Sequence, residues 1–472
     1  MKRLGAVLLA VVLAHGTWTF ARQAVSVLSS PWSRDYGEGC TLAMARLLAE
    51  RGNYFPDLAD YPFLVANYPP VFLSLVAAGQ SVLGPSLFFP RLLAFLATLG
   101  LLTVLFVTLR RLVGRAAPAL AFTLLFVMPW FVTTWSALAR VDTTALLLTL
   151  AGLTVVLRRG TGARAWPALV LFWLAFFTKQ NAIVAPAAVL VHLALERDRR
   201  FLRALLAYAL PLGALFGLLV LATRGGAWRH LVTYTAAASY EWSRMGESYL
   251  QLAVVAGPLL LLVAAGLALA PAAFRGGENR ILLLYFGLSV VAFATIAKAG
   301  AAQNYFLEPW LAIVLLGARA FRALDERTVW LRPRWPAIVA LAAAVANGSY
   351  HSLHRLPHAL SHPENAEEFV ALTRLVHETP GPVLSENLSL LVLDRRPVLL
   401  EPFGVQLIAE RGLFRPERLV RDCEAGRFPL VVAEHRMWEI PAFGECLERR
   451  YVPVADLGPY QALRPRPAAS RR

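Results

Sequence analysis

Charged side chains are scarce in this chain. Asp, Glu, Lys and Arg together make up 16% of its 472 residues, whereas hydrophobic residues make up 57%. Soluble globular domains typically carry about 25% charged residues and at most about 50% apolar ones. The composition therefore excludes an ordinary soluble protein of this length and indicates an integral membrane protein with several spans.

Cysteine is scarce as well. The chain has three, Cys40, Cys423 and Cys446, and none of them lies in a metal-binding motif such as a CxxC pair. Three cysteines are also too few for a disulfide framework. We therefore expect neither redox nor zinc chemistry. A bond between Cys423 and Cys446 is left open, since an oxidising outer compartment would permit it.

Long apolar runs dominate the sequence. A helix of about 20 apolar residues crosses the hydrocarbon core of a bilayer, so each run is a candidate span. We predict about eleven transmembrane helices. The first resembles a signal peptide, but the many spans after it favour an uncleaved anchor. The windows are residues 4–28, 91–109, 116–136, 142–157, 165–178, 181–195, 201–222, 249–273, 280–297, 304–318 and 335–350.

The positive charges lie mainly between these windows. The chain has 46 Lys and Arg against 30 Asp and Glu, a net charge of +16, and the excess falls in short basic loops such as residues 110–115, 158–164 and 197–203. The positive-inside rule places such loops in the cytoplasm. We therefore expect membrane lipids, and not nucleic acid, as partners of this charge.

One short apolar stretch, residues 69–83, decides the predicted topology. As a helix it would be about 22 Å long, which is shorter than a hydrocarbon core of about 30 Å. We interpret it as a helix at the outer interface, started by two prolines. With this choice every basic loop and the amino terminus are cytoplasmic, and residues 29–90 form a long first outer loop.

The tail differs from the rest of the chain. We predict a transmembrane module over residues 1–350 and a small extracytoplasmic α/β domain over residues 351–472, because the tail is polar and interrupted by prolines. The predicted fold class is thus an all-α polytopic membrane protein with a C-terminal α/β domain. We expect tail helices at residues 364–377 and 416–424, and tail strands at residues 382–385, 397–401, 428–433 and 451–455.

Three carboxylates lie just beyond the ends of predicted spans. Asp35 and Glu38 follow the first span, and Asp142 begins the fourth. Charge beside hydrocarbon is costly without a use, so each is a candidate catalytic residue, and a shielded carboxylate can act as general base towards an acceptor hydroxyl. The structural alternative is that Asp35 or Ser33 caps a helix over residues 38–51, that Glu38 complements its dipole, and that Asp142 caps its own helix.

Cations and hydrogen-bond donors at other outer span ends are candidate substrate-binding residues. Lys179 and Gln180 end one apolar run, and Lys298 precedes Asn304 and Tyr305. A departing phosphate needs positive charge and donors aimed at its oxygens. The alternative is that the lysines only extend from helix ends to the membrane interface.

Several stretches resemble the GT-C superfamily of glycosyltransferases that use lipid-linked sugars, in particular the branch of the protein mannosyltransferases and aminoarabinose transferases. They lie within about the first 320 residues and keep their order relative to the predicted spans, whereas the tail matches no piece. The stretches are SRDYGEGCTLAMARLLAERG, NYPPVFL, RLLAFLATLGLLTVLFVTLRRLVGR, ALARVDTTALLL, FFTKQNAIVAP and AQNYFLE.

This resemblance implies an inverting enzyme that takes a sugar from a polyprenyl phosphate at the outer face of a bacterial cytoplasmic membrane and passes it to an acceptor. Asp35 would be the catalytic base, and Asp142 would line the site. A divalent metal such as Mg²⁺ or Mn²⁺, held by Asp35 and Asp142, is left open. Arg140, Lys179 and Lys298 would stabilise the leaving polyprenyl phosphate.

The chain departs from the family pattern in two places. Many relatives have adjacent Asp and Glu, whereas Tyr36 and Gly37 separate Asp35 from Glu38 here. Aminoarabinose-transferase-like members carry a lysine before the double proline, where this chain has Tyr68, a residue that could help to wall the site. The donor sugar and the acceptor, whether glycan, lipid or protein, are therefore not identified.

The rival hypothesis is a transporter or flippase for a lipid or a small solute. Transporters typically place polar groups and broken helices at the bilayer midplane. Here the centres of the predicted spans are almost free of charge, and the acidic candidates gather at one rim. The sequence therefore favours the enzyme. A mere anchor for the outer domain is ranked last, because one helix would suffice.

Overall fold

The computed structural model describes the chain except for residues 1, 329–341, 344, 348–349, 351–365 and 468–472. The chain divides into two compact units. The first unit comprises Met1–Ser29, Arg91–Leu215 and Tyr240–Leu360, and the second comprises Ser30–Pro90, Phe216–Ser239 and Ser361–Arg472. The domain boundary predicted between residues 350 and 351 borders undescribed residues and stays a prediction.

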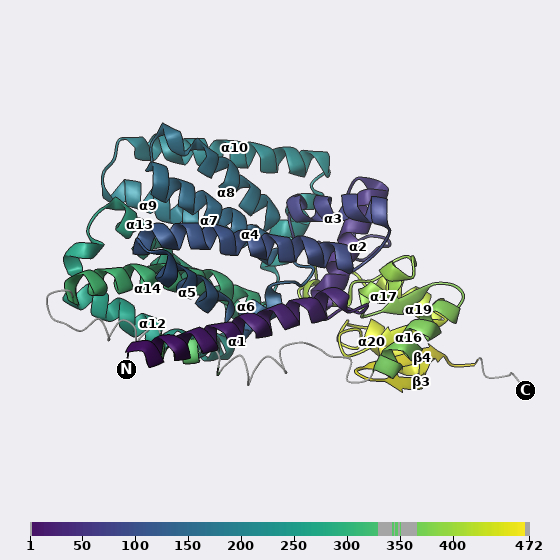
Figure 1. The fold of residues 1–472 in the computed structure, drawn as a ribbon. Helices are drawn as coiled ribbons and strands as arrows, with labels where there is room; N and C mark the ends of the chain where they lie inside the picture. Colours follow the sequence, from purple (N-terminus) through teal and green to yellow (C-terminus); the bar gives the residue numbers. More distant parts are fainter. Residues whose placement is uncertain (1, 329–341, 344, 348–349, 351–365, 468–472) are drawn as a thin grey trace, which may run out of the picture. The chain divides into compact units, whose positions relative to one another are not determined.

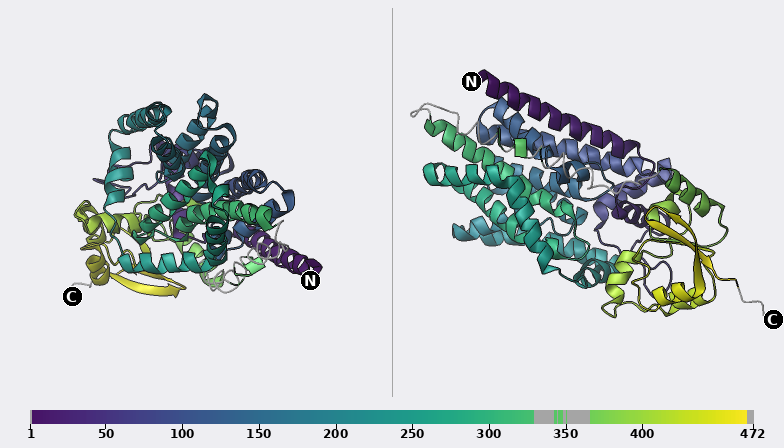
Figure 2. Two further views of the ribbon diagram at one scale, coloured as in Figure 1. Left: turned by 90° about the vertical axis from the view of Figure 1, so that its left-hand side faces the viewer. Right: turned by 90° about the horizontal axis from the view of Figure 1, so that it is seen from below.

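The first unit is built from apolar helices that run alongside one another (Figures 1 and 2). Its core is a large cluster of aliphatic and aromatic side chains, in which Trp310 donates its indole N–H to the carbonyl oxygen of Phe126 at 2.9 Å. The helices are α1 (Lys2–Ser29), α4 (Phe88–Val113), α5 (Ala116–Val127), α6 (Trp130–Trp135), α7 (Asp142–Arg159), α8 (Trp166–Thr178), α9 (Val184–Leu195), α10 (Arg200–Ala222), α12 (Trp242–Leu269), α13 (Gly277–Phe293) and α14 (Leu307–Thr328).

The predicted membrane windows are mostly helical where the structure describes them. Each of the first ten contains at least one helix, and most of the eleventh, residues 335–350, lies outside the described residues. Among the described helices, four are long and apolar enough to cross a bilayer, namely Phe88–Val113, Arg200–Ala222, Trp242–Leu269 and Gly277–Ala297. Helices α8 and α9 have 13 and 12 residues, so each reaches only about 20 Å. The predicted fold class, a polytopic helical membrane protein, is confirmed.

The window at residues 116–136 is not one continuous helix. It divides into α5 and α6 at Met128 and Pro129, because proline has no N–H to continue the helical ladder. The carbonyl oxygen of Val127 instead accepts the hydroxyl of Thr133 at 2.8 Å. A proline inside an apolar run marked this break in the sequence.

The second unit brings the first loop and the tail into shared hydrophobic cores. Its largest helix, α2 (Tyr36–Arg51), ends at Gly52, whose φ of 66° suits glycine. Helix α3 (Pro70–Leu83) confirms the predicted helix that starts at the double proline. The other helical segments are α11 (Gly226–Trp228), the π-helix η2 (Arg229–Tyr234), α16 (Ala366–Glu378), α17 (Leu388–Leu393), α18 (Pro402–Ala409), α19 (Glu417–Glu424) and α20 (Phe443–Arg450).

A small mixed sheet forms the centre of the tail. The strands are β1 (Val383–Ser385), β2 (Leu430–Ala433), β3 (Tyr451–Leu457) and β4 (Tyr460–Pro465), in the order β1-β2-β4-β3. Strands β1 and β2 are parallel, and the other two pairs are antiparallel. The sheet confirms the predicted α/β tail, including both predicted tail helices and three of the four predicted strands, whereas β4 was not predicted.

The fourth predicted strand, residues 397–401, is wrong as a member of the sheet. This segment forms an isolated bridge with the first loop: Phe63 N donates to Leu399 O, and Glu401 N donates to Phe63 O, both at 2.8 Å. The apolar residues of the segment do pack into a core, but their backbone pairs with a part of the chain more than 300 residues away in the sequence. The alternation of apolar and polar residues along a segment does not predict which other segment it pairs with.

Buried His230 connects the segment Phe216–Ser239 of the second unit to the first loop. Its Nδ1 accepts the N–H of Ala66 at 3.0 Å, so Nε2 carries the proton and donates to Pro56 O at 2.9 Å. Burial, the largest cause, lowers the pKa of His230 to about 4. The imidazole is therefore neutral at physiological pH, which the hydrogen bond from Ala66 requires.

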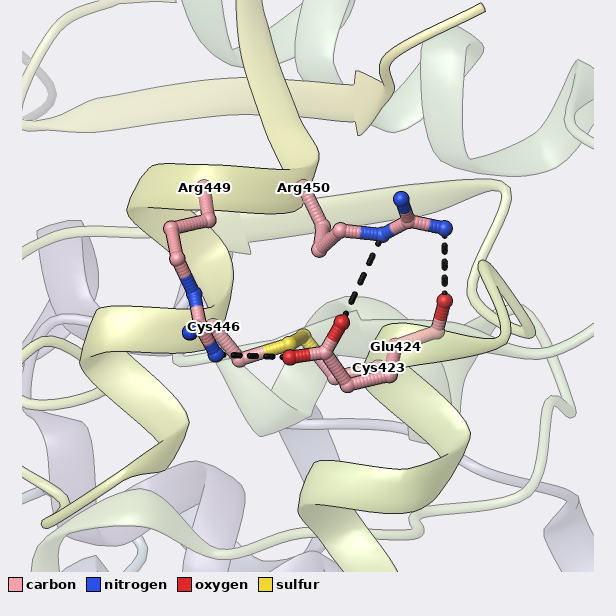
Figure 3. Close-up of a disulfide and its surroundings, with 5 residues drawn as sticks. All are labelled: Cys423, Glu424, Cys446, Arg449 and Arg450. Carbon is pink, nitrogen blue, oxygen red and sulfur yellow. Dashed lines mark hydrogen bonds and ion pairs between the residues drawn. A yellow bond between two sulfur atoms is a disulfide. The ribbon is translucent and has the colours of Figure 1, made fainter. Parts of the chain in front are cut away.

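A disulfide bond joins Cys423 of α19 to Cys446 of α20, which answers the question that the sequence left open (Figure 3). Both cysteines are fully buried. Glu424 supports the same junction: its carboxylate lies 2.7 Å from Arg449 and 3.6 Å from Arg450, and its carbonyl oxygen accepts a further hydrogen bond from Arg450 (Figure 3).

Removing this disulfide is expected to destabilise the tail. Replacing both Cys423 and Cys446 by alanine should lower the free energy of unfolding by about 3 kcal/mol, because a closed loop of this size restricts the unfolded chain. Thermal unfolding of the purified protein, with and without reductant, measures the effect. The matched control is Cys40→Ala, which removes a buried cysteine that forms no disulfide. Equal midpoints for the double variant and wild type would contradict the bond.

Candidate active site

A buried ion pair joins the start of α7 to the end of α8. The Asp142 side chain is almost fully buried, and its Oδ1 accepts hydrogen bonds from Lys179 Nζ at 2.6 Å and from Asn304 Nδ2 at 2.7 Å. Lys179 is the residue directly after α8, and Asn304 lies in the 3₁₀ helix η5 (Gln303–Phe306). Three segments that are far apart in the sequence therefore meet at one carboxylate.

The local structure stabilises Asp142 and Lys179 at the positions that they occupy. Helices α7 and α8 pack side by side, so the first residue of one lies near the last of the other. A carboxylate is stabilised at a helix N-terminus and a cation at a helix C-terminus, and Asp142 and Lys179 occupy these two positions. The aromatic ring of Tyr305 adds a second contact to the lysine, 4.9 Å from Nζ.

The structure decides against one alternative from the sequence. Asp142 is the first helical residue of α7 and not its cap, since the cap position is Val141 and no side-chain capping bond is present. Its carboxylate faces Lys179 and Asn304 instead. The buried charge is thus neutralised by a partner from another helix.

Arg140 adds a second cation to this cluster. Its Nε lies 3.9 Å from Asp142 Oδ2, beyond hydrogen-bond distance, and its guanidinium lies over the ring of Trp135 at 5.2 Å. Gln180 follows Lys179 directly. Lys298 comes directly after the 3₁₀ helix η4 (Ala294–Ala297), in an isolated bridge with Tyr240, and forms no ion pair within the described part of the chain. Of the predicted cations, Lys179 and Arg140 are therefore the two that contact Asp142.

A cavity of about 200 Å³ opens beside the ion pair. Two of the buried oxygen atoms around it, Asp142 Oδ2 and Asn304 Oδ1, accept no hydrogen bond from any residue that the structure describes. Unsatisfied buried acceptors are costly, so they indicate a place for a ligand that donates hydrogen bonds. The polar lining residues are Asp142, Thr149, Lys179, Asn181, Ser289, Thr295, Asn304, Tyr305 and Glu308.

Glu308 is a member of this cavity that the sequence analysis missed. It lies in the first turn of α14, and its Oε1 accepts the hydroxyl of Tyr285 at 3.3 Å. It belongs to the quoted stretch AQNYFLE and to the predicted span at residues 304–318. An ionisable residue inside a span is by itself a functional signal, and that signal could have identified it.

Asp35 belongs to the second unit and caps helix α2. Its Oδ1 accepts the N–H of Gly37 at 3.0 Å, which confirms the predicted capping geometry. Glu38 is fully buried, and its Oε2 accepts the N–H of Arg34 at 2.7 Å. Both carboxylates thus hold the turn before α2. Tyr68, in the same unit, accepts the Tyr54 hydroxyl with its carbonyl oxygen at 2.9 Å.

The residues around Asp142 do not fit a divalent metal. Lys179 and Arg140 already place two positive charges within 4 Å of its carboxylate, and a dication added there would be repelled. Among the described residues, the one trio of groups close enough to share an ion is Glu386, Glu434 and His435, which includes neither Asp35 nor Asp142.

The comparisons with known proteins bear on the fold. No protein-family model and no curated protein matches the chain. Two crystal structures of ArnT from Cupriavidus metallidurans do: the apo state, with a TM-score of 0.63 at 15% identity over 98% of both chains, and a form bound to undecaprenyl phosphate, with a TM-score of 0.64 at 14% identity over 96% of this chain and 97% of that one.

The chain has the ArnT fold. The resemblance predicted from the sequence is thereby confirmed at the level of the fold, and the likeness extends over the tail that matched no sequence piece. At 14–15% identity the likeness concerns the fold. The roles of the individual site residues stay predictions.

The buried pair makes a prediction about stability. Lys179→Gln should lower the free energy of unfolding by about 3–5 kcal/mol, because it leaves the Asp142 carboxylate buried without its cation. The double variant with Asp142→Asn should recover much of the loss, since no buried charge then remains. Thermal unfolding of the two single variants and the double variant forms a double-mutant cycle.

The matched control for this cycle is Glu326→Gln in the first unit. It removes one partner of the exposed pair formed with Arg322, which should cost less than about 1 kcal/mol. If Lys179→Gln changed stability no more than Glu326→Gln, the Asp142–Lys179 contact would not be the buried ion pair described here.

The site implied by the family resemblance, with Asp35 as base and Asp142 in the lining, requires both residues to reach one cleft, although they belong to different units. Asn181 is exposed and lines the cavity beside Asp142. In the Asp35→Cys, Asn181→Cys double variant, a short bifunctional maleimide should therefore join the two positions. The control pair places the second cysteine at exposed Arg199, in a loop predicted to be cytoplasmic. Cross-linking of the control pair alone would show that the two sites lie apart.

Proposed function

We propose that the protein is a glycosyltransferase that moves a sugar from a polyprenyl-phosphate donor to an acceptor at the outer face of the cytoplasmic membrane. The observation that carries this proposal is the Asp142–Lys179–Asn304 cluster beside the 200 Å³ cavity, in a chain with the ArnT fold. The ArnT structure bound to undecaprenyl phosphate supports a polyprenyl-linked donor.

In the proposed reaction Asp35 is the general base. Its carboxylate takes the proton of the acceptor hydroxyl while the acceptor oxygen attacks the anomeric carbon of the donor sugar. The bond from that carbon to the phosphate oxygen breaks on the opposite side, and its electron pair goes to the polyprenyl phosphate. One displacement of this kind inverts the anomeric carbon.

In the proposed reaction the cations of the first unit stabilise the leaving phosphate. Lys179 is held in place by Asp142 and Tyr305, so its charge is positioned before the donor arrives. Arg140 places a second positive charge 3.9 Å from Asp142 Oδ2, and a guanidinium is well suited to binding phosphate oxygens. Lys298 is a third candidate. We propose that these cations act in place of a metal, since the residues around Asp142 do not fit one.

The oxygen acceptors of the cavity complement the sugar. Asp142 Oδ2, Asn304 Oδ1 and the Glu308 carboxylate can each accept a hydrogen bond from a sugar hydroxyl. A sugar would therefore satisfy the two buried oxygens that the described residues leave without a hydrogen bond, and the phosphate would face the cations at the rim. This division of polar groups favours a transferase over the rival transporter, for which related polar sites at the midplane would be expected.

Two observations support the outer face as the place of reaction. The Cys423–Cys446 bond requires an oxidising compartment, which lies outside the cytoplasm. The basic loops of the first unit, such as residues 158–164, favour the cytoplasm by the positive-inside rule. The tail and the basic loops would thus lie on opposite sides of the membrane.

The proposal is tested by assaying the purified protein with a panel of labelled polyprenyl-phosphate sugars, with and without EDTA. We expect transfer from at least one donor, and we expect it to persist in EDTA. Loss of transfer in EDTA would restore the metal hypothesis. Solute counterflow in proteoliposomes, without transfer from any donor, would overturn the proposed function in favour of a transporter.

Asp35→Asn tests the base within the same assay. Asparagine keeps an oxygen that can cap α2 but cannot accept the proton, so kcat should fall by about 10²–10⁴-fold with folding intact. The matched control is Asp57→Asn, because exposed Asp57 also accepts a backbone N–H two residues further on, from Ala59. Full activity of Asp35→Asn would reject Asp35 as the base.

A further inference from the structure

The segment that carries Asp35 is enclosed by residues of the tail. We call residues 30–40 the Asp35 segment; they include the cap and first turn of α2. The tail residues that contact it come from α16, α17 and α18 and their flanking loops, all within the second unit. The contacts fall on both sides of Asp35 in the sequence, at Ser33 and at Tyr36.

Before Asp35, a cluster of hydroxyls and one amide holds Ser33. The Ser33 hydroxyl donates to Asn387 Oδ1 at 3.2 Å, and the Ser389 hydroxyl lies 3.0 Å from Ser33 Oγ and 2.6 Å from the same Asn387 oxygen. Asn387 Nδ2 in turn donates to the hydroxyl of Tyr460 on β4 at 3.3 Å. The amide therefore connects the Asp35 segment to the sheet of the tail.

After Asp35, a buried tyrosine–glutamate pair holds Tyr36. The Tyr36 hydroxyl donates to Glu401 Oε1 at 2.6 Å and accepts the N–H of Phe403 at 3.2 Å. Glu401 is 1% exposed, and it also caps α18 by accepting the N–H of Gly404 at 2.9 Å. One carboxylate thus fixes both the start of α18 and the side chain that follows Asp35.

The backbones approach closely at this interface. A Cβ on Gly39 would lie 2.8 Å from Ser389 N, so only glycine permits the observed approach of α2 to α17. The rings of Trp32 and Phe369 add an aromatic contact with centroids 4.9 Å apart. Such contacts restrict where the start of α2, and hence the Asp35 carboxylate, can lie.

We infer that Asn387 and Glu401 are positioning residues for Asp35, so that the tail forms part of the catalytic centre instead of being a separable appendage. This inference rests on the proposed function, in which Asp35 is the base. The geometry supports it, because the tail contacts Ser33 and Tyr36 on the two sides of Asp35, while Asp35 itself caps α2. A general base must be held within hydrogen-bond reach of the proton that it takes.

The first test is Tyr36→Phe, which removes the hydroxyl and keeps the ring. Hydrogen–deuterium exchange should become faster in residues 30–40 of the full-length protein. In the transfer assay kcat should fall by about tenfold, less than the ~10²-fold cost of a 1 Å misplacement, and the donor KM should stay unchanged. Loss of a hydrogen bond with a merely structural role would not lower kcat while leaving the donor KM unchanged.

The matched control is Tyr61→Phe. Tyr61 also donates its hydroxyl to a carboxylate of the tail, Asp422 Oδ2 at 2.9 Å, but it does not belong to the Asp35 segment. This variant should leave both kcat and the exchange of residues 30–40 at wild-type values. Equal losses of kcat in both tyrosine variants would overturn the inference.

Two substitutions of Glu401 test whether its hydrogen bond to Tyr36, and not its negative charge, is needed. Glu401→Gln keeps an oxygen that can accept from Tyr36 and should retain most of kcat, whereas Glu401→Leu should lose it as Tyr36→Phe does. Wild-type kcat in Glu401→Leu would contradict the inference. If the wild-type protein transferred no sugar at all, the proposed function would fail. Independently of that result, unchanged hydrogen–deuterium exchange of residues 30–40 in Tyr36→Phe would show that Glu401 does not hold the Asp35 segment.

Discussion

The first unit depends on one buried ion pair. Moving a carboxylate and an ammonium out of water costs several kcal/mol for each ion, and the attraction between them offsets this only in good geometry with added hydrogen bonds. Asp142 and Lys179 meet that condition through a 2.6 Å contact, the amide of Asn304 and the ring of Tyr305. Apolar residues of similar size would often be at least as stable there, so the presence of the pair suggests selection for a task.

Much of the first unit could be predicted from the sequence, because its helices follow directly from apolar runs. The exception at Pro129 follows from a single missing N–H. The partners of Asp142 could not be predicted, since 37 and 162 residues separate it from Lys179 and Asn304. Hydropathy shows that a helix is buried in lipid or protein, but it does not show which helix ends meet.

The second unit was harder to predict because its cores are shared between distant segments. The pairing of Phe63 with residues 399 and 401, the bonds of His230 to Pro56 and Ala66, and the contact of Tyr36 with Glu401 all join residues more than 160 positions apart. Each segment shows its apolar face locally, whereas its partner is set by tertiary packing. The capping role of Asp35 was predictable, because a cap uses only its own neighbours in the chain.

The helix cap orients the carboxylate of Asp35. A carboxylate has two oxygens with about four lone-pair directions, and the cap at Gly37 uses one oxygen. The cap fixes the direction of the carboxylate, and the contacts of Ser33 and Tyr36 fix the turn that carries it. The same logic holds at Asp142, where Oδ1 binds Lys179 and Asn304 while Oδ2 accepts no hydrogen bond from the described residues. In both units the orientation of the carboxylate is thus fixed by the contacts described, and a fixed orientation is what a preorganised site requires.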